Sequence, residues 1–180
     1  MVEAEWLAFH IVTILAGRFG SEYLAAQSAL VTLMTISFQI PFPLSVAAST
    51  RVANLIGADA ADTAKLAAKF TFIMAGVFGH LDLAIYTTLR SYLPLLFTRD
   101  RDVIDLVSRM SPLVAVMQFF DSISTGAHGL LRGLGKQSIG GIASLFSYYA
   151  ISLPISFYLA FALDLKLAGM WTGLTIGLFV

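Results

Sequence analysis

Four long apolar stretches constrain the fold of this chain more than any other feature. They cover residues 24–50, 70–89, 103–131 and 139–163. A hydrocarbon core of about 30 Å requires about 20 apolar residues in a helix that rises roughly 1.5 Å per residue. Two shorter apolar stretches, 2–17 and 167–180, run to the two ends of the sequence. The pattern predicts an all-α, polytopic transmembrane bundle with six membrane segments, of which the first and last are incomplete.

The composition agrees with a membrane protein. Hydrophobic residues make up 58% of the chain and charged residues 12%, with a mean hydropathy of +0.83, whereas a soluble domain carries about 25% charge. Eleven basic residues balance eleven acidic ones, so the charge indicates neither nucleic acid nor an acidic substrate. There is no cysteine, which excludes disulfides and thiolate metal sites. The sequence also contains no zinc-protease motif, nucleophile elbow or phosphate loop, so we predict neither an enzyme nor a bound cofactor.

The polar segments between the apolar stretches predict the connections. Residues 51–69 are rich in alanine and charge, and we interpret them as a surface segment that includes a possible amphipathic helix. Residues 98–102 form a charged turn in which Thr98, Asp100 or Asp102 could cap the next helix. Pro41 and Pro43 lie inside the stretch 24–50, where they predict a bend or local unwinding of the helix.

One helical face in the fourth long stretch is polar. Its members recur at spacings of three or four and are Gln118, Asp121, Thr125, His128 and Arg132. A carboxylate at membrane depth costs roughly 2.5–3.5 kcal/mol on insertion scales, so it usually faces a partner, a cavity or a transport route. The two cationic side chains lie about 10 and 16 Å from Asp121 along the helix axis, too far for direct pairing within it. The stripe therefore favours a transport protein over an ordinary helical domain.

Several short motifs are distributed along the chain: Ala25-Ala26-Gln27-Ser28, Gln39-Ile40-Pro41-Phe42-Pro43, the run 46–58, Glu5-Trp6, the run 131–137, Tyr148-Tyr149 and Leu153-Pro154. With these motifs the chain resembles the multidrug and toxic compound extrusion (MATE) family, and its eukaryotic, fungal-like branch is most similar. The motifs keep the order and spacing of the family across nearly the whole chain. The resemblance implies that residues 1–180 are the C-terminal lobe, helices seven to twelve of a twelve-helix exporter, cut at both ends.

The resemblance also implies a site. Members of the family exchange protons or sodium for organic cations or other amphipathic compounds, and in the eukaryotic branch coupling is attributed to acidic residues on helices seven and ten. Glu5 and Asp121 match these positions. His10 stands where the family usually has a second acidic residue, and Pro43 stands where glycine is common.

Other residues have two interpretations each. His10 lies about 140° around the helix from Glu5, so it is either a proton relay or a hydrogen-bonded histidine between helices. Gln118, Thr125 and Tyr148 either line a cavity with Asp121 or pack through interhelical hydrogen bonds. We interpret Asp82 as a carboxylate near the interface that pairs with an outer residue such as Arg90.

These observations predict a secondary antiporter that exports organic cations, drugs or amphipathic metabolites in exchange for protons. Protonation of Glu5 and Asp121 would remove the charge that attracts the substrate and favour its release. A sodium-coupled exporter, a lipid-type flippase of the same superfamily, and a truncated helical scaffold without transport remain alternatives. The expected partners are the lipid bilayer, the missing N-terminal lobe and a small organic substrate, in the plasma or vacuolar membrane.

Overall fold

The structure is a computed structural model that describes residues 2–179, and the side chains of residues 5–179. Over this range it contains helices and turns but no strand, which confirms the all-α prediction. The α-helices are α1 (Val2–Ala16), α2 (Ser21–Phe38), α3 (Pro41–Gly57), α4 (Ala61–Thr88), α5 (Arg101–Gly133), α6 (Gln137–Leu145), α7 (Leu153–Phe157) and α8 (Lys166–Phe179). Short 3-10 turns occupy Gly17–Phe19 and Leu93–Leu96, and wider π-helical turns occupy η3 (Phe146–Ser152) and η4 (Tyr158–Ala162).

Four stretches of the described chain are long and apolar enough to cross a membrane. They are Ser21–Gly57, which comprises α2 and α3, then Ala61–Thr88, Arg101–Gly133 and Gln137–Ala162. The expected count of six spans is not confirmed, because α1 has 15 residues and α8 has 14. Both short helices nevertheless pack into the bundle, where α8 contacts α5 and α7 and α1 contacts α2.

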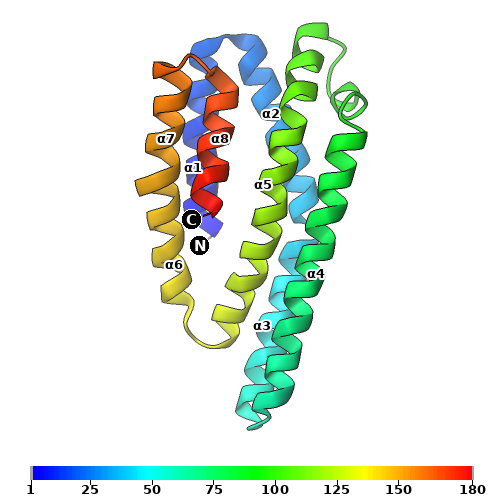
Figure 1. Cartoon of the computed structure of the whole chain (residues 1–180), viewed down its shortest axis with the longest axis vertical. Coiled ribbons are helices and arrows are strands. Elements are labelled where there is room, and N and C mark those ends of the chain that lie inside the picture. The colour runs from blue at the N-terminus through cyan, green and yellow to red at the C-terminus, as the bar shows by residue number, and fades with distance from the viewer. Residues whose placement is uncertain (1, 180) are drawn as a thin grey trace.

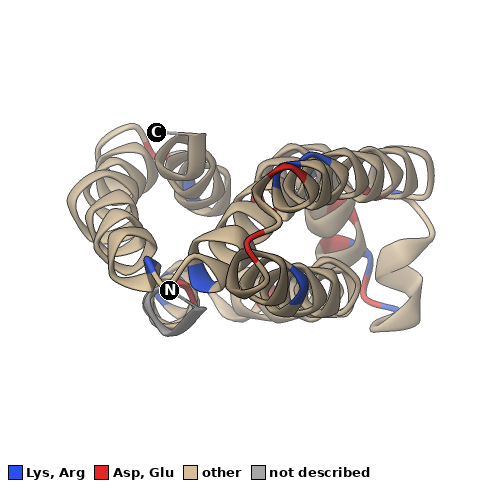
Figure 2. Ribbon diagram, turned by 90° about the horizontal axis from the view of Figure 1, so that it is seen from below, with Lys and Arg blue, Asp and Glu red and all other residues tan. Residues whose placement is uncertain are grey.

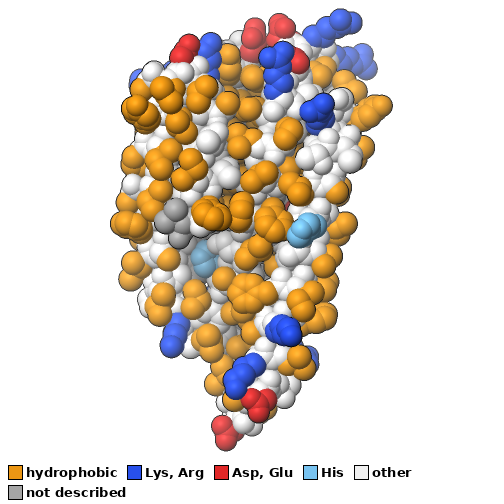
Figure 3. All heavy atoms as spheres, viewed as in Figure 1, with side chains coloured by type: hydrophobic (Ala, Val, Ile, Leu, Met, Phe, Trp, Pro, Cys, Tyr) orange, Lys and Arg blue, Asp and Glu red, His pale blue; other side chains and the backbone are white. Residues whose placement is uncertain are grey.

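The bundle is elongated and α5 crosses its centre. One group of helices, α1, α6, α7 and α8, lies on one side of α5, α3 and α4 lie on the other, and α2 crosses behind α5 (Figure 1). Viewed along the long axis, the helices form two adjoining clusters (Figure 2). On the face shown in Figure 3, apolar side chains cover the middle and charged side chains gather at the two ends, as a bilayer requires.

The segment 51–69 differs from the surface segment expected from the sequence. It contains the last turns of α3 and the first turns of α4, joined by a short turn at Asp59, whose φ is 55°. Alanine favours helix wherever it lies, and the charged side chains of Arg51, Lys65 and Lys69 point outward on these helices. The charges therefore mark the exposed faces of two long helices, and the expected connection is confined to the short turn between them.

The stretch 24–50 was predicted as one helix with a bend or local unwinding at its prolines, and the structure divides it into α2 and α3. Pro41 and Pro43 have no backbone N–H, so the carbonyl groups of Ser37 and Gln39 lose the donors that an unbroken helix would supply. The backbone forms a tighter turn here, in which Ile40 N donates to the Ser37 carbonyl oxygen, three residues earlier, at 3.2 Å. The result is a break between α2 and α3 in the middle of a membrane span.

The start of α5 follows one of the three capping possibilities. The Asp100 carboxylate accepts a hydrogen bond from Asp102 N at 3.0 Å, and Asp100 is the N-cap. Thr98 Oγ1 accepts from Asp100 N at 3.1 Å and stabilises the turn before it.

Close packing of α5 against α3 depends on glycine. A Cβ added at Gly133 would lie 2.7 Å from the Ser49 carbonyl oxygen, and one added at Gly129 would lie 2.6 Å from Ser45 Oγ. Small residues let helix backbones approach closely in membranes, where van der Waals contact drives association. These two glycines, four residues apart, therefore set the distance between the two helices.

Candidate coupling site in the helix bundle

The polar stripe on α5 lies on the buried face of the helix. The exposed fractions of Gln118, Asp121 and Thr125 are 2%, 3% and 6%. Two further stripe residues bind other helices, since His128 Nε2 lies 3.3 Å from Ser144 Oγ and Arg132 Nη2 donates to Ser45 Oγ at 2.7 Å. Asp121 therefore has no cationic side chain of its own stripe as a hydrogen-bond partner, as the helical spacing predicted.

Glu5 on α1 reaches Asp121 across the bundle. Both carboxyl groups are withdrawn from solvent, and each lies close enough to the other for their charges and hydrogen-bonding groups to interact. The Tyr148 hydroxyl, from η3, faces both carboxyl groups. Two carboxylates in such a position repel each other unless a proton or another cation lies between them. Residues far apart in sequence thus form one acidic site.

Two buried polar atoms, Gln118 Oε1 on α5 and Ser152 Oγ on η3, have no hydrogen-bond partner in the described part of the chain. The buried Tyr148 hydroxyl faces the Glu5 carboxyl group instead. The Gln118 amide nitrogen donates weakly to the Met34 carbonyl oxygen, at 3.5 Å. Buried polar atoms are normally satisfied by protein, water or ligand, so these atoms are free to bind water, an ion or a substrate group.

A cavity of about 280 Å³, lined by polar and apolar side chains, opens beside the acidic site. Tyr148, His128 and Ser144 line it together with Ser124, Ser147, Ala143, Phe146, Ile151 and Leu178. A larger groove of about 490 Å³ lies between α3 and α4, but its lining is mainly apolar and contains none of the predicted site residues. The smaller cavity therefore provides the space next to Tyr148.

Two residues considered from the sequence lie elsewhere. His10 is exposed on α1, away from the buried face that carries Glu5. Asp82 was expected near the interface and paired with Arg90, but its exposed fraction is only 9%. The ion pairs of the described residues are Lys65–Asp62 at 3.0 Å and Arg109–Asp105 at 2.7 Å, and Asp82 belongs to neither. The expectation for Asp82 was wrong because α4 turns this residue toward α2 and α5.

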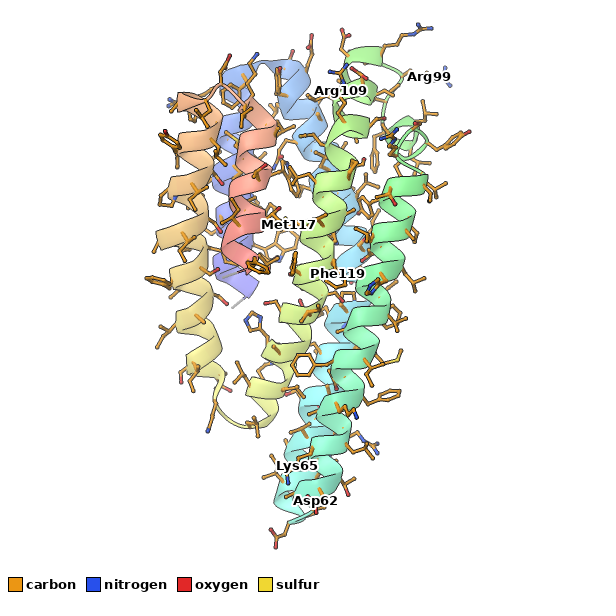
Figure 4. The ribbon with its side chains drawn as sticks, in the orientation of Figure 1. Asp62, Lys65, Arg99, Arg109, Met117 and Phe119 are labelled. Atoms are coloured by element: carbon orange, nitrogen blue, oxygen red, sulfur yellow. The ribbon has the colours of Figure 1, made fainter. Side chains whose placement is uncertain are left out.

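The two ion pairs lie at the ends of the bundle instead. Figure 4 shows Asp62 and Lys65 at one tip, and Arg109, which pairs with Asp105, near the other end together with Arg99. Phe119 lies in the middle of α5, where its ring packs edge-on against the His80 ring of α4 with centroids 4.9 Å apart.

A second buried polar network was not found from the sequence. Trp171 Nε1 of α8 donates to Gln27 Oε1 of α2 at 2.8 Å, and Gln27 Nε2 donates to Thr13 Oγ1 of α1 at 3.3 Å. Gln27 and Trp171 are fully buried. A glutamine within an apolar stretch is the signal that could have indicated the network, but its partner lies 144 residues away.

Together the fold and the site define an integral membrane protein, a polytopic helical bundle with carboxyl groups buried in its interior. The family model MatE matches residues 1–158, and the chain belongs to this family, whose members are transporters and not enzymes.

Similar proteins cover nearly the whole chain. It is 38% identical over 176 residues to multidrug and toxin extrusion protein 2 of Mus musculus, covering 98% of this chain and 31% of that protein. It is 36% identical over 174 residues to an uncharacterized transporter of Saccharomyces cerevisiae, covering 97% of this chain and 25% of the relative. The chain thus spans about a third or less of the length of these relatives.

Solved structures show the same fold. The crystal structure of the eukaryotic MATE transporter AtDTX14 superposes with a TM-score of 0.92 and 32% identity, covering 97% of this chain and 39% of that one. An outward-facing MATE transporter superposes with a TM-score of 0.90 at 16% identity, covering 99% of this chain and 39% of that one.

Proposed function

We propose that residues 1–180 form the C-terminal lobe of a two-lobe MATE transporter that exports organic cations or other amphipathic compounds in exchange for protons. The family match, and names such as multidrug and toxin extrusion protein among the relatives, support the transport class. The observation that carries the coupling mechanism is the approach of Glu5 and Asp121 inside the bundle, with no cation paired to either among the described residues.

The two carboxyl groups can act as a charge switch. When both are ionised, their repulsion and their low-dielectric surroundings favour the entry of a cation or of a cationic substrate. When protons arrive, the site loses its charge, binds the substrate less tightly and favours a rearranged packing of the helices that carry the two carboxyl groups. Substrate and protons then occupy the site alternately, which is the requirement for exchange.

The Tyr148 hydroxyl and the cavity beside it support this exchange. The hydroxyl has no other hydrogen-bond partner in the described part of the chain and can donate to either carboxylate. The cavity beside it is large enough for several water molecules, which occupy about 30 Å³ each in liquid water. Under this proposal, the polar side chains of Gln118 and Thr125, on α5, line the same site.

The test is gradient-driven efflux from proteoliposomes that contain the complete transporter carrying these residues. Asp121→Asn and Glu5→Gln are nearly isosteric but cannot ionise, so each should abolish efflux of a fluorescent organic cation driven by an imposed pH gradient. Asp105→Asn, on the same helix as Asp121 but in an exposed ion pair, is the matched control and should leave efflux unchanged. Wild-type efflux by Asp121→Asn would refute the proposed coupling role, and efflux that follows sodium and ignores pH would establish sodium as the coupling ion.

A further inference from the structure

A second oxygen-rich cluster lies beside the break between α2 and α3. Ser37, two residues before the break, has its hydroxyl 3.1 Å from the Tyr86 hydroxyl of α4. The Asp82 carboxylate, one helical turn before Tyr86, also faces Ser37. Both α4 residues are buried, with exposed fractions of 9% for Asp82 and 2% for Tyr86. The cluster thus collects a carboxylate and two hydroxyl groups at membrane depth.

The helix break adds backbone oxygen to the same region. Pro41 and Pro43 cannot donate to the carbonyl groups of Ser37 and Gln39, as described above, and Ile40 N makes only a 3.2 Å hydrogen bond to the first of these. Carbonyl groups at interrupted helices in membranes often coordinate cations, and hard monovalent or divalent cations prefer such oxygen ligands.

Among the described residues, no cationic side chain forms an ion pair with Asp82. The titratable groups that face it are Tyr86 on its own helix and Asp121 on α5, while α2 contributes the Ser37 hydroxyl. A buried carboxylate without a counter-charge is costly, so it holds a proton or binds a cation from solution.

Asp82 is also linked to the candidate coupling site. Its charge acts directly on Asp121. The two helices meet at Gly79 and Phe119, where a Cβ added to Gly79 would lie 3.2 Å from the Phe119 backbone. Because the two helices run antiparallel, Asp82 and Asp121 lie on opposite sides of this contact along the helix axes. A cation that neutralises Asp82 would therefore lower the electrostatic cost of charge on Asp121.

We propose that Asp82, Ser37 and Tyr86 form a second site for a monovalent cation, proton or sodium, and that its occupancy regulates the Glu5–Asp121 site. This inference rests on the proposed transport function. Cation occupancy of the second site is coupled to the charge of the Glu5–Asp121 site. The break between α2 and α3 lies next to Asp82, the group whose charge the bound cation neutralises.

Carbodiimide labelling tests the binding part without any transport assay. Dicyclohexylcarbodiimide reacts with protonated carboxyl groups in apolar surroundings, and mass spectrometry locates the product. Labelling of Asp82 is expected, with Asp62 as an exposed control on the same helix, 97% exposed and unlabelled. Protection by sodium chloride but not by choline chloride identifies a sodium site, and labelling that falls with rising pH and ignores sodium identifies a proton site. No labelling of Asp82 at any pH overturns the proposal.

Transport kinetics test the coupling part. In the complete transporter, Asp82→Asn should shift the cation concentration for half-maximal exchange by at least about fivefold, as coupled sites typically do. Tyr86→Phe and Ser37→Ala, which keep the shape of the interior, should shift it in the same direction and report on the site if Asp82→Asn does not fold. Asp62→Asn is the matched control. If the cation dependence is unchanged in all three site variants and Asp121→Asn still abolishes exchange, the second site is refuted and the primary coupling role stands. Normal exchange in Asp121→Asn would instead refute the primary coupling role.

Discussion

Gly129→Ala tests whether backbone contact holds α5 against α3. The added Cβ would meet the Ser45 backbone carbonyl and lie 2.6 Å from Ser45 Oγ, which also accepts a hydrogen bond from Arg132. Neither neighbour is the free end of a flexible side chain, so the helices must separate. Overpacking of this kind costs about 1–3 kcal/mol. Alanine has a higher helix propensity than glycine, which offsets about 1 kcal/mol of this cost. The free energy of unfolding should therefore fall by up to about 2 kcal/mol.

Gly76→Ala is the matched control for this prediction. Gly76 lies inside α4, and a Cβ added there would meet nothing within 4 Å. The Gly76→Ala variant has the same gain in helix propensity without the steric clash, so it should be more stable than wild type by about 1 kcal/mol. The two variants should therefore differ by about 1–3 kcal/mol in equilibrium unfolding of the purified protein in mixed micelles. Equal stability of the two variants would show that α3 and α5 do not meet as closely as described.

Three further predictions concern the interior and the lobe. Trp171→Phe should lower the free energy of unfolding by about 1–3 kcal/mol because it leaves Gln27 Oε1 buried without its donor, and equilibrium unfolding that matches wild type would contradict this. Asp121→Glu should transport faster than Asp121→Asn in proteoliposome efflux, since a titratable group survives; equal loss in both variants would show that position, and not charge, matters at this residue. The 180-residue chain alone should not carry out proton-driven efflux after reconstitution, because alternating access requires two lobes; dye efflux by the purified chain would refute this.

The sequence predicts local features of this fold well. The polar stripe on α5 follows from helical periodicity, and burial of Gln118, Asp121 and Thr125 confirms that it faces inward. The break at Pro41 and Pro43 and the cap at Asp100 also follow from local chemistry, whereas Pro112 lies inside the continuous helix α5.

Features that depend on distant partners could not be predicted in this way. Arg132 reaches Ser45, 87 residues away, because Gly129 and Gly133 bring the two helices together. The orientation of Asp82 and the Gln27–Trp171 hydrogen bond likewise depend on how helices pack, which hydropathy does not encode. The approach of Glu5 to Asp121 was implied only by family resemblance, and its role in coupling stays a prediction.

Proton release on substrate binding tests the central claim most directly. If substrate and protons compete for the Glu5–Asp121 site, addition of an organic cation to the complete transporter in weakly buffered detergent solution should release protons, seen with a pH indicator. Asp121→Asn should bind the substrate with little or no release, and Asp105→Asn should release as many protons as wild type. Equal proton release by wild type and Asp121→Asn would contradict the account, because the protons would then come from groups outside this site.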